Sequence, residues 1–194
     1  MSKKLRREDL MDMDTYGKVR PERRQAVTEM KKNRRIGVGP DATCYFESYE
    51  TMWHQTHEML FIEKGGEAQI EDELNAYAPM VPNGRELVMT LMFEVDDPDR
   101  RGALLNGLGG VEETISIGVG GDVIMGVADD DIDRTTADGK ASAIQFLHFP
   151  FSDHQVADFK NSENKTVISI SHEKYGHMAV IPEAMRTTLI EDFD

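Results

Sequence analysis

The sequence predicts an α+β fold in which a helical N-terminal half, built around a helical hairpin, packs against a mainly antiparallel C-terminal sheet of about five or six strands. Residues 49–77 hold two helical patterns separated by a Lys-Gly-Gly break, which is typical of a helical hairpin. After Gly84 the pattern changes to short alternating segments with turn signals between them, which is typical of antiparallel strands. Because the helices precede the strands instead of alternating with them, the sequence disfavours a doubly wound α/β fold.

The chain length bounds the organisation of the fold. A chain of 194 residues suits a single domain over residues 1–194. Within it we expect a basic helical arm over residues 1–40, a strand followed by the helical hairpin over residues 41–84, and an antiparallel sheet with helices over residues 85–194.

In the arm, we expect short helices that begin at aspartates and at Pro21. Proline suits the first turn of a helix because the N–H that it lacks has no intrahelical partner there. The basic run that ends at Arg35 suits the C-terminal end of such a helix through the helix dipole. The residues GVGP at positions 37–40 are then expected to break the chain.

The middle segment is expected to begin with a short strand over ATCYFES, residues 42–48. A helix is expected over residues 49–63, where the Lys-Gly-Gly break ends it. A second helix is expected over residues 67–77, and Pro79 and Pro82 prevent its continuation.

Strand and turn signals dominate the C-terminal half. The expected strands are ELVMTLMFEV, TISIGV, DVIMGV, AIQFLHFPF, TVISISH and HMAVI. Gly120 and Gly121 separate the second of these strands from the third, which is a strong hairpin signal. Helices are expected to begin at Pro98, at a cap supplied by Ser152 or Asp153, and at Pro182.

Charge is distributed unevenly along the chain. Residues 1–35 carry twelve Lys or Arg against six Asp or Glu, a net charge of +6, and the remaining residues carry ten against thirty, a net charge of −20, which together make −14. A body this acidic repels phosphate backbones, so nucleic acid is excluded as its partner. The basic arm is expected either to bind an anionic surface or to dock on the acidic body of its own chain or of a second copy.

The single cysteine, Cys44, excludes a disulfide within the chain, a CxxC zinc or redox site and an iron–sulfur cluster held by this chain alone. On a short strand it is expected to be a small buried apolar residue. The charged N-terminus lacks the apolar core of a signal peptide, and no run of about 18 apolar residues predicts a membrane span. We therefore expect a cytoplasmic protein.

Residues 53–63, WHQTHEMLFIE, carry the main candidate site. On a helical wheel at about 100° per residue, Glu50, His54, His57 and Glu58 share one face, opposite the apolar face. Imidazole and carboxylate groups at these spacings suit metal ligation, and they equally suit an ordinary solvent-facing side of a helix. The order HxxHE differs from the HExxH zinc motif and from the ExxH of di-metal helices. Both interpretations stay open.

No motif in the chain requires a cofactor. The glycines around Gly118 and Gly120 lack the GxGxxG order of a dinucleotide site, and the chain has neither a Walker loop nor a GxSxG elbow. ADDDIDR, residues 128–134, alternates aspartates as a calcium loop does, but it lacks the required glycine and the final glutamate. It therefore predicts a surface loop.

Several longer stretches resemble a single protein family. They are LRREDL, YGKVRPERR, KKNRRIGVGP, FESYETM, EML with Glu63 behind it, EDELNAYAPMVPNG, SAIQFLHF and PEAM. Together they extend over nearly the whole chain and resemble an uncharacterised bacterial family, the domain of unknown function number 3501. The resemblance implies a gene neighbourhood with rubrerythrin and a cysteine-rich iron–sulfur oxidoreductase, and hence a role in cytoplasmic peroxide or redox handling.

The resemblance also bears on the candidate helix. The family pattern has glutamine and glutamate at the positions of Gln55 and Glu58, but it does not require histidine at the positions of His54 and His57. The residues to which it points are Gln55, Glu58, Glu63, Tyr77, Pro79 and Pro82.

Three functions stay open. The first is a non-enzymatic accessory protein or partner of rubrerythrin or the iron–sulfur oxidoreductase in a redox or peroxide-stress system. The alternative is a metal-dependent or acid–base enzyme centred on the helix over residues 50–63, with Gln55, Glu58 and Glu63 as candidate catalytic residues. The third is a small-molecule sensor that uses a pocket between hairpin and sheet. A homo-oligomer is compatible with all three.

Overall fold

The structure, a computed structural model, describes residues 4–128 and 139–194. Its helices, in chain order, are the 3-10 helix η1 (Arg7–Asp9), α1 (Met13–Lys31), α2 (Tyr49–Glu63), α3 (Glu67–Tyr77), the 3-10 helix η2 (Ala78–Met80), α4 (Pro98–Leu105), the 3-10 helix η3 (Val111–Thr114), α5 (Asp153–Lys160) and α6 (Glu183–Ile190). None of these described helices combines the length and the apolar character that a membrane span needs. The predicted loop over residues 128–134 lies, from Asp129 on, outside the described residues.

Nine strands form two antiparallel sheets in the described part of the chain. They are β1 (Arg35–Val38), β2 (Ala42–Phe46), β3 (Glu86–Phe93), β4 (Ile115–Val119), β5 (Asp122–Met125), β6 (Val127–Ala128), β7 (Ile144–Pro150), β8 (Val167–His172) and β9 (Tyr175–Val180). The five-stranded sheet has the order β1-β2-β3-β7-β6, and the four-stranded sheet has the order β5-β4-β8-β9.

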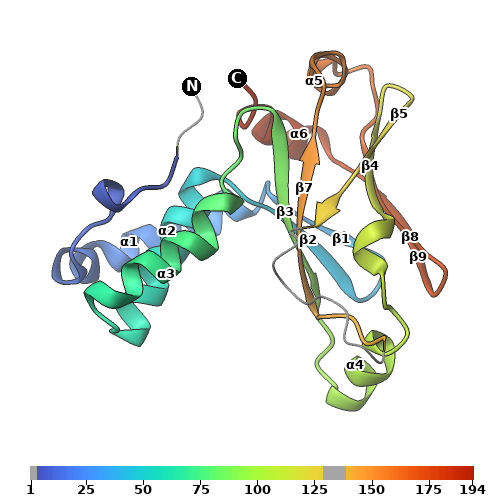
Figure 1. Cartoon of the computed structure of the whole chain (residues 1–194). Coiled ribbons are helices and arrows are strands. Elements are labelled where there is room, and N and C mark those ends of the chain that lie inside the picture. The colour runs from blue at the N-terminus through green and yellow to red at the C-terminus, as the bar shows by residue number, and fades with distance from the viewer. Residues whose placement is uncertain (1–3, 129–138) are drawn as a thin grey trace.

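The helices and the two sheets stack as three layers (Figure 1). Helices α1, α2 and α3 cover one face of the five-stranded sheet, and the four-stranded sheet lies on its other side. The central strand β3 contacts both of the other layers. Val88 belongs to the apolar cluster under the helices, and Leu87, Met89 and Leu91 belong to the core between the sheets. Strand β3 is therefore buried on both faces over Leu87–Leu91.

The structure confirms the α+β class and the helical hairpin, but its strands form two sheets instead of one. The β4–β5 hairpin turns at Gly120 and Gly121, which both have positive φ, as predicted. It pairs through β4 with the β8–β9 hairpin. One face of the resulting sheet carries Ile117 and Ile168, which are fully buried. Since a sheet with one apolar face is stable when that face packs on another sheet, these strands form a layer of their own.

The predicted start of a helix at Pro21 is wrong. Helix α1 is continuous from Met13 to Lys31, its N-cap is Asp12, and Pro21 lies inside it. A proline inside a helix removes one hydrogen bond and crowds the carbonyl four residues earlier, at Gly17. The packing of α1 on α2 outweighs this cost, since Tyr16 is fully buried against the rings of Trp53 and Phe61.

The predicted break at GVGP, residues 37–40, is wrong for its first two residues, which belong to a strand. Arg35–Val38 forms strand β1, which pairs with β2 in the register Arg35 to Tyr45 and Val38 to Ala42. The turn between the two strands uses Gly39, whose φ is +77°. Gly-Pro is a local signal that shows the turn, whereas the strand before it exists only through its pairing with β2.

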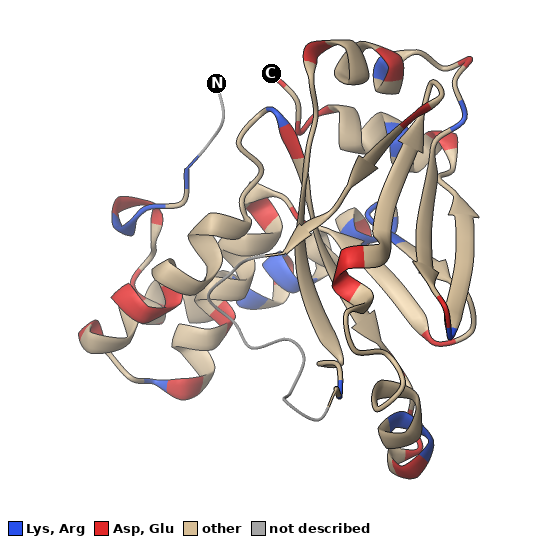
Figure 2. Ribbon diagram, turned by 45° about the vertical axis from the view of Figure 1, so that its right-hand side comes forward, with Lys and Arg blue, Asp and Glu red and all other residues tan. Residues whose placement is uncertain are grey.

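Among the described residues, three arginines of the basic arm form ion pairs with acidic residues outside the arm. Arg7 pairs with Glu67, Arg20 with Glu58 and Arg34 with Asp192. Figure 2 shows basic and acidic segments close together in and around the helical layer. One of the expected uses of the arm is docking on the acidic body of its own chain. These three arginines make such contacts.

Candidate functional site

A cavity of about 560 Å³ lies between the helical layer and the five-stranded sheet. Its floor is formed by side chains from three neighbouring strands. Tyr45 of β2, Thr90 of β3 and Phe146 of β7 are in register with one another, and Met92 and Ile144 form the next row. Because successive side chains of a strand alternate between faces, these positions all point away from the core between the sheets.

The roof of the cavity comes from the helices. Helix α2 contributes Thr51, Met52 and Gln55, which lie at i, i+1 and i+4 and so share the face toward the sheet. Tyr77 closes the end of α3, and Lys31 lies in the last turn of α1. The cavity therefore brings together Gln55 and Tyr77, which the sequence analysis had singled out separately. Pro79 and Pro82 line a smaller, separate cavity beside Leu5.

Glu47 lines the same cavity with a buried carboxylate. The residue is only 6% exposed, and it lies between the end of β2 and Ser48, the N-cap of α2. Its Oε1 accepts a hydrogen bond of 2.7 Å from the Thr90 hydroxyl, and its Oε2 accepts one of 2.7 Å from the Thr51 hydroxyl. Across residues 4–128 and 139–194, no Lys, Arg or His lies within ion-pair distance of this carboxylate.

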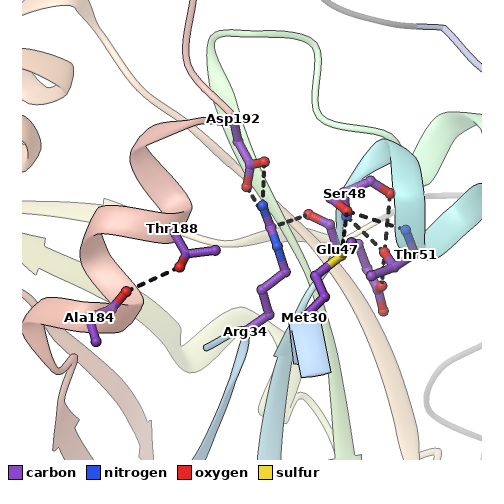
Figure 3. Close-up of polar contacts among 8 residues, drawn as sticks. All are labelled: Met30, Arg34, Glu47, Ser48, Thr51, Ala184, Thr188 and Asp192. Atoms are coloured by element: carbon purple, nitrogen blue, oxygen red, sulfur yellow. Dashed lines mark hydrogen bonds and ion pairs between the residues drawn. The ribbon is translucent and has the colours of Figure 1, made fainter. Parts of the chain in front are cut away.

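The backbone of Glu47 is held as firmly as its side chain. Its N–H donates to the carbonyl of Val88 at 2.8 Å, and its carbonyl accepts from Nη1 of Arg34 at 3.2 Å. The guanidinium of Arg34 in turn binds Asp192 (Figure 3). Figure 3 also shows the capping contacts of Ser48 and Thr51 that begin α2 beside the glutamate. The carboxylate position is thus set by a strand, a helix start and the C-terminal segment.

A second polar group lies on the side of α2 that faces α1. The Tyr16 hydroxyl donates to Oε1 of Glu58 at 2.7 Å, and Arg20 donates to both oxygens of the same carboxylate at 2.8 and 2.9 Å. Since the Tyr16 proton is used in this way, Nδ1 of His54, 3.1 Å from the phenol oxygen, is assigned as the donor to it. Hydrogen bonds from Arg20 first, and then from Tyr16, lower the pKa of Glu58 to about 2.

This group ties α1 to α2 and is poorly suited to proton transfer. Glu58 stays ionised at neutral pH and is already bound by two donors, so it is a weak base. Burial, followed by the hydrogen bond to Glu58, raises the pKa of Tyr16 above its usual range. Burial also lowers the pKa of His54, so its ring is neutral at pH 7.

One interpretation of the helical wheel predicts that His57 lies on a solvent-facing side of α2. The structure differs from that prediction. His57 is fully buried beneath α1 and stacks on Trp53 with ring centroids 3.8 Å apart. Its Nε2 accepts from the backbone N–H of Met11 at 3.0 Å, so its Nδ1 is the donor to the carbonyl of Trp53 at 2.7 Å. Both ring nitrogens are therefore used in holding the segment before α1 against α2.

The remaining candidate residues lie apart from one another. Glu63 accepts a hydrogen bond from the side chain of Gln69 in α3, and Glu50 lines a separate cavity with Arg23 and Trp53. In the part of the chain that the structure describes, no group of three or more His, Cys, Asp and Glu side chains is placed to hold a metal ion. Of the four candidate ligands, His54 and Glu58 meet around the hydroxyl of Tyr16.

Sequence reasoning missed Glu47 and Lys31 as cavity residues. Glu47 lies within FESYETM, one of the stretches that carry the family resemblance, but it was assigned to the end of a strand. The available signal was an acidic residue directly before a serine N-cap, where the chain changes from strand to helix. That signal does not reveal whether the side chain is buried, so it could not distinguish Glu47 from a surface glutamate.

The three layers and the cavity define an α+β protein with two stacked antiparallel sheets, a helical cover and a cavity beneath that cover. The chain belongs to the family described as protein of unknown function (DUF3501), whose model matches residues 4–193. It is similar to a crystal structure of a novel protein of unknown function from Burkholderia pseudomallei K96243, with 33% identity, a TM-score of 0.90, and coverage of 99% of this chain and 100% of that one. No curated protein matches the chain.

Proposed function

We propose that this protein is a non-enzymatic small-molecule-binding protein whose ligand occupies the cavity between α2, α3 and the five-stranded sheet. The observation that carries the proposal is the Glu47 carboxylate, which is buried, lines the cavity and has no cationic partner among the described residues. Burying an ionised group without a cation is costly, so such groups mark binding sites. A cavity of about 560 Å³ also has the size of known ligand pockets.

The chemistry of the pocket supports binding more than turnover. Apolar side chains of Met52, Met80, Met92 and Phe146 form much of its lining. A few polar groups lie among them, which is the usual composition of a site that fixes a ligand's orientation. Both oxygens of Glu47 already accept a hydroxyl hydrogen bond, so the carboxylate is held in place as a recognition group.

A cavity-filling variant tests the proposal. Ala76 is an exposed residue of α3 that lines the cavity, so Ala76→Phe places a ring across the pocket without changing the core. Ala68→Phe is the matched control, because Ala68 is exposed on the same helix and away from the cavity. We expect molecules from a fragment library, detected by ligand-observed NMR, to bind the parent chain and Ala68→Phe and to lose binding in Ala76→Phe. Absence of any fragment with this pattern would contradict the proposal.

We further propose that the protein acts in the cytoplasm as an accessory partner of rubrerythrin or of an iron–sulfur oxidoreductase, as the gene neighbourhood implied by the family resemblance suggests. The observation that favours a docking role is the outer face of the four-stranded sheet. Two cross-strand rows lie on it, Val123-Gly118-Val167-Val180 and Met125-Ser116-Ser169-Met178. Val123, Met178 and Val180 are more than half exposed, and the two rows contain no charged residue.

An uncharged sheet face on an acidic chain is a surface through which a partner can dock. The test is co-purification of the chain with rubrerythrin and with the oxidoreductase from the native cell, at low salt. We expect Met178→Glu to abolish it and Thr187→Glu, the same added charge at an exposed position on α6, to preserve it. Failure of the parent chain to retain either protein would refute this role and leave the cavity proposal intact.

A further inference from the structure

We infer that the cavity ligand is amphoteric: it carries a cationic group for Glu47, an anionic group for Lys31 and an apolar body. This inference rests on the proposed binding function and specifies its ligand class. The juxtaposition that supports it is one acidic and one basic side chain in the lining of a single cavity, without an ion pair between them.

Glu47 supplies the cationic subsite. Each of its carboxylate oxygens accepts one hydroxyl hydrogen bond, from Thr51 or Thr90. A carboxylate oxygen has two lone-pair sites, so each keeps capacity for a further donor. An ammonium group has three donors and the opposite charge, and it therefore satisfies both the remaining hydrogen-bond capacity and the uncompensated charge.

Lys31 supplies the anionic subsite. It lies in the last turn of α1, is partly buried and lines the cavity. No described acidic side chain lies within ion-pair distance of it, whereas its neighbour Lys32 pairs with Glu29 at 2.7 Å. A lysine ammonium is a compact charge that binds carboxylate or phosphate without requiring a planar partner.

The walls specify the body of the ligand. The same lining includes three thioether side chains, from Met52, Met80 and Met92, and the ring of Phe146. Methionine adapts to irregular apolar shapes and makes favourable contacts with aromatic rings. An apolar side chain of moderate size, aromatic or aliphatic, fits such a lining.

Singly charged ligands fit this cavity less well. An apolar acid would satisfy Lys31 but would bring a second anion into the pocket of the Glu47 carboxylate. An apolar amine would satisfy Glu47 and leave Lys31 with a like charge in the same pocket. A polyphosphate would bring several negative charges to a site with one lysine and one buried glutamate.

Three probes with one common body separate these cases. They are L-phenylalanine, 2-phenylethylamine and 3-phenylpropanoate, measured by titration calorimetry or NMR at pH 7. The three share a phenyl ring on a two-carbon chain and differ in their charged groups. We expect L-phenylalanine to bind at least about tenfold more tightly than either singly charged probe, because it contacts both subsites.

Variants assign each subsite. Lys31→Met is expected to remove the advantage of L-phenylalanine over 2-phenylethylamine, and Glu47→Gln to remove its advantage over 3-phenylpropanoate. Lys32→Met is the matched control for the lysine, since Lys32 does not line the cavity. Circular dichroism reports whether each variant folds. If Glu47→Gln does not fold, the Lys31→Met comparison still decides, because the Lys31 side chain forms no hydrogen bond or ion pair with the described residues.

The outcomes separate this inference from the proposed function. Equal affinities for the three probes, or an unchanged preference in Lys31→Met, overturn the amphoteric assignment. The amphoteric assignment is also overturned if none of the three probes binds while another fragment binds the parent chain and loses binding in Ala76→Phe. If no molecule of any class binds the parent chain and loses binding in Ala76→Phe, the proposed binding function itself is contradicted.

Discussion

Arg34 and Asp192 are 158 positions apart in the chain, and they form two parallel hydrogen bonds of 2.8 Å between guanidinium and carboxylate. Their side chains are only 5% and 7% exposed. Because Arg34 also donates to the carbonyl of Glu47, the segment that follows α6 is coupled to the position of the cavity glutamate. The pair thus connects the end of the chain with the candidate site.

Removing one member of this pair is expected to destabilise the fold. Asp192→Ala leaves a buried guanidinium without its anion, which costs about 3 kcal/mol of the free energy of unfolding. The measurement is urea denaturation followed by circular dichroism. Glu191→Ala, a neighbouring exposed carboxylate, is the control and should change the free energy of unfolding by less than about 0.5 kcal/mol.

Replacing both members of the pair is expected to lower the free energy of unfolding by less than the sum of the two single replacements. Burial raises the pKa of Asp192 even though Arg34 lies beside it, which indicates that desolvation offsets much of the attraction. In Arg34→Met with Asp192→Leu, neither charge is left unpaired in the interior. A double-mutant cycle with strictly additive losses would show that the two residues are not coupled.

The Arg20–Glu58 pair predicts how stability depends on pH. The pKa of Glu58 is lowered from its ordinary value of 4.5 to about 2 in the folded chain, so folding favours the ionised form. The resulting stabilisation is fully present above the unfolded pKa and is lost as pH falls from about 4.5 toward 2. In Arg20→Gln the free energy of unfolding should be lower than in the parent chain at pH 7 and converge with it at low pH. Parallel denaturation series at several pH values measure this, and an equal gap at all pH values would contradict it.

Cys44 is expected to be unreactive in the folded protein. It is fully buried in β2, and burial raises its pKa to about 12. A thiol reacts through its thiolate, which is scarce at pH 8 under these conditions. A disulfide reagent such as Ellman's should therefore label about one thiol per chain in denaturant and almost none under native conditions. Rapid labelling of the native chain would contradict the buried position.

Gly39 is expected to tolerate alanine much less well than Gly110, although both have nearly the same φ, +77° and +79°. A Cβ at Gly39 would lie 2.6 Å from the His177 ring, whereas a Cβ at Gly110 meets nothing within 4 Å. Gly110→Ala should cost about 1 kcal/mol through backbone strain alone. Gly39→Ala should cost at least about 1 kcal/mol more, because the ring has to move. Thermal melts of the two variants give the comparison. Equal losses of stability would show that the His177 ring moves aside without cost and would contradict the prediction.

Most secondary-structure elements were predictable because their signals are local. The predicted helices over residues 49–63 and 67–77 agree with α2 and α3. Ser48 begins α2 with a side-chain cap, and the Lys-Gly-Gly break ends it, at Lys64 in a left-handed conformation. Caps and turns depend on hydrogen bonds within about four residues, which a single sequence displays.

The candidate site was only partly predictable. Gln55 lies in the cavity, as its selection as a candidate residue predicts, but Glu58, one turn further along α2, contacts α1 instead. The helical wheel grouped His54, His57 and Glu58 correctly as neighbours. It could not show that α1 covers them, because the order of residues within one helix contains no information about the element packed on it.

The sequence by itself determined the α+β class, the hairpins, the caps and the acidic charge of the chain. Tertiary structure alone decided that Pro21 continues a helix, that the strands divide into two sheets, and that Glu47 is buried in a cavity. The physical reason is range. Local propensities act over a few residues, whereas burial and ion pairing depend on segments such as those of Arg34 and Asp192, which meet only after the chain has folded.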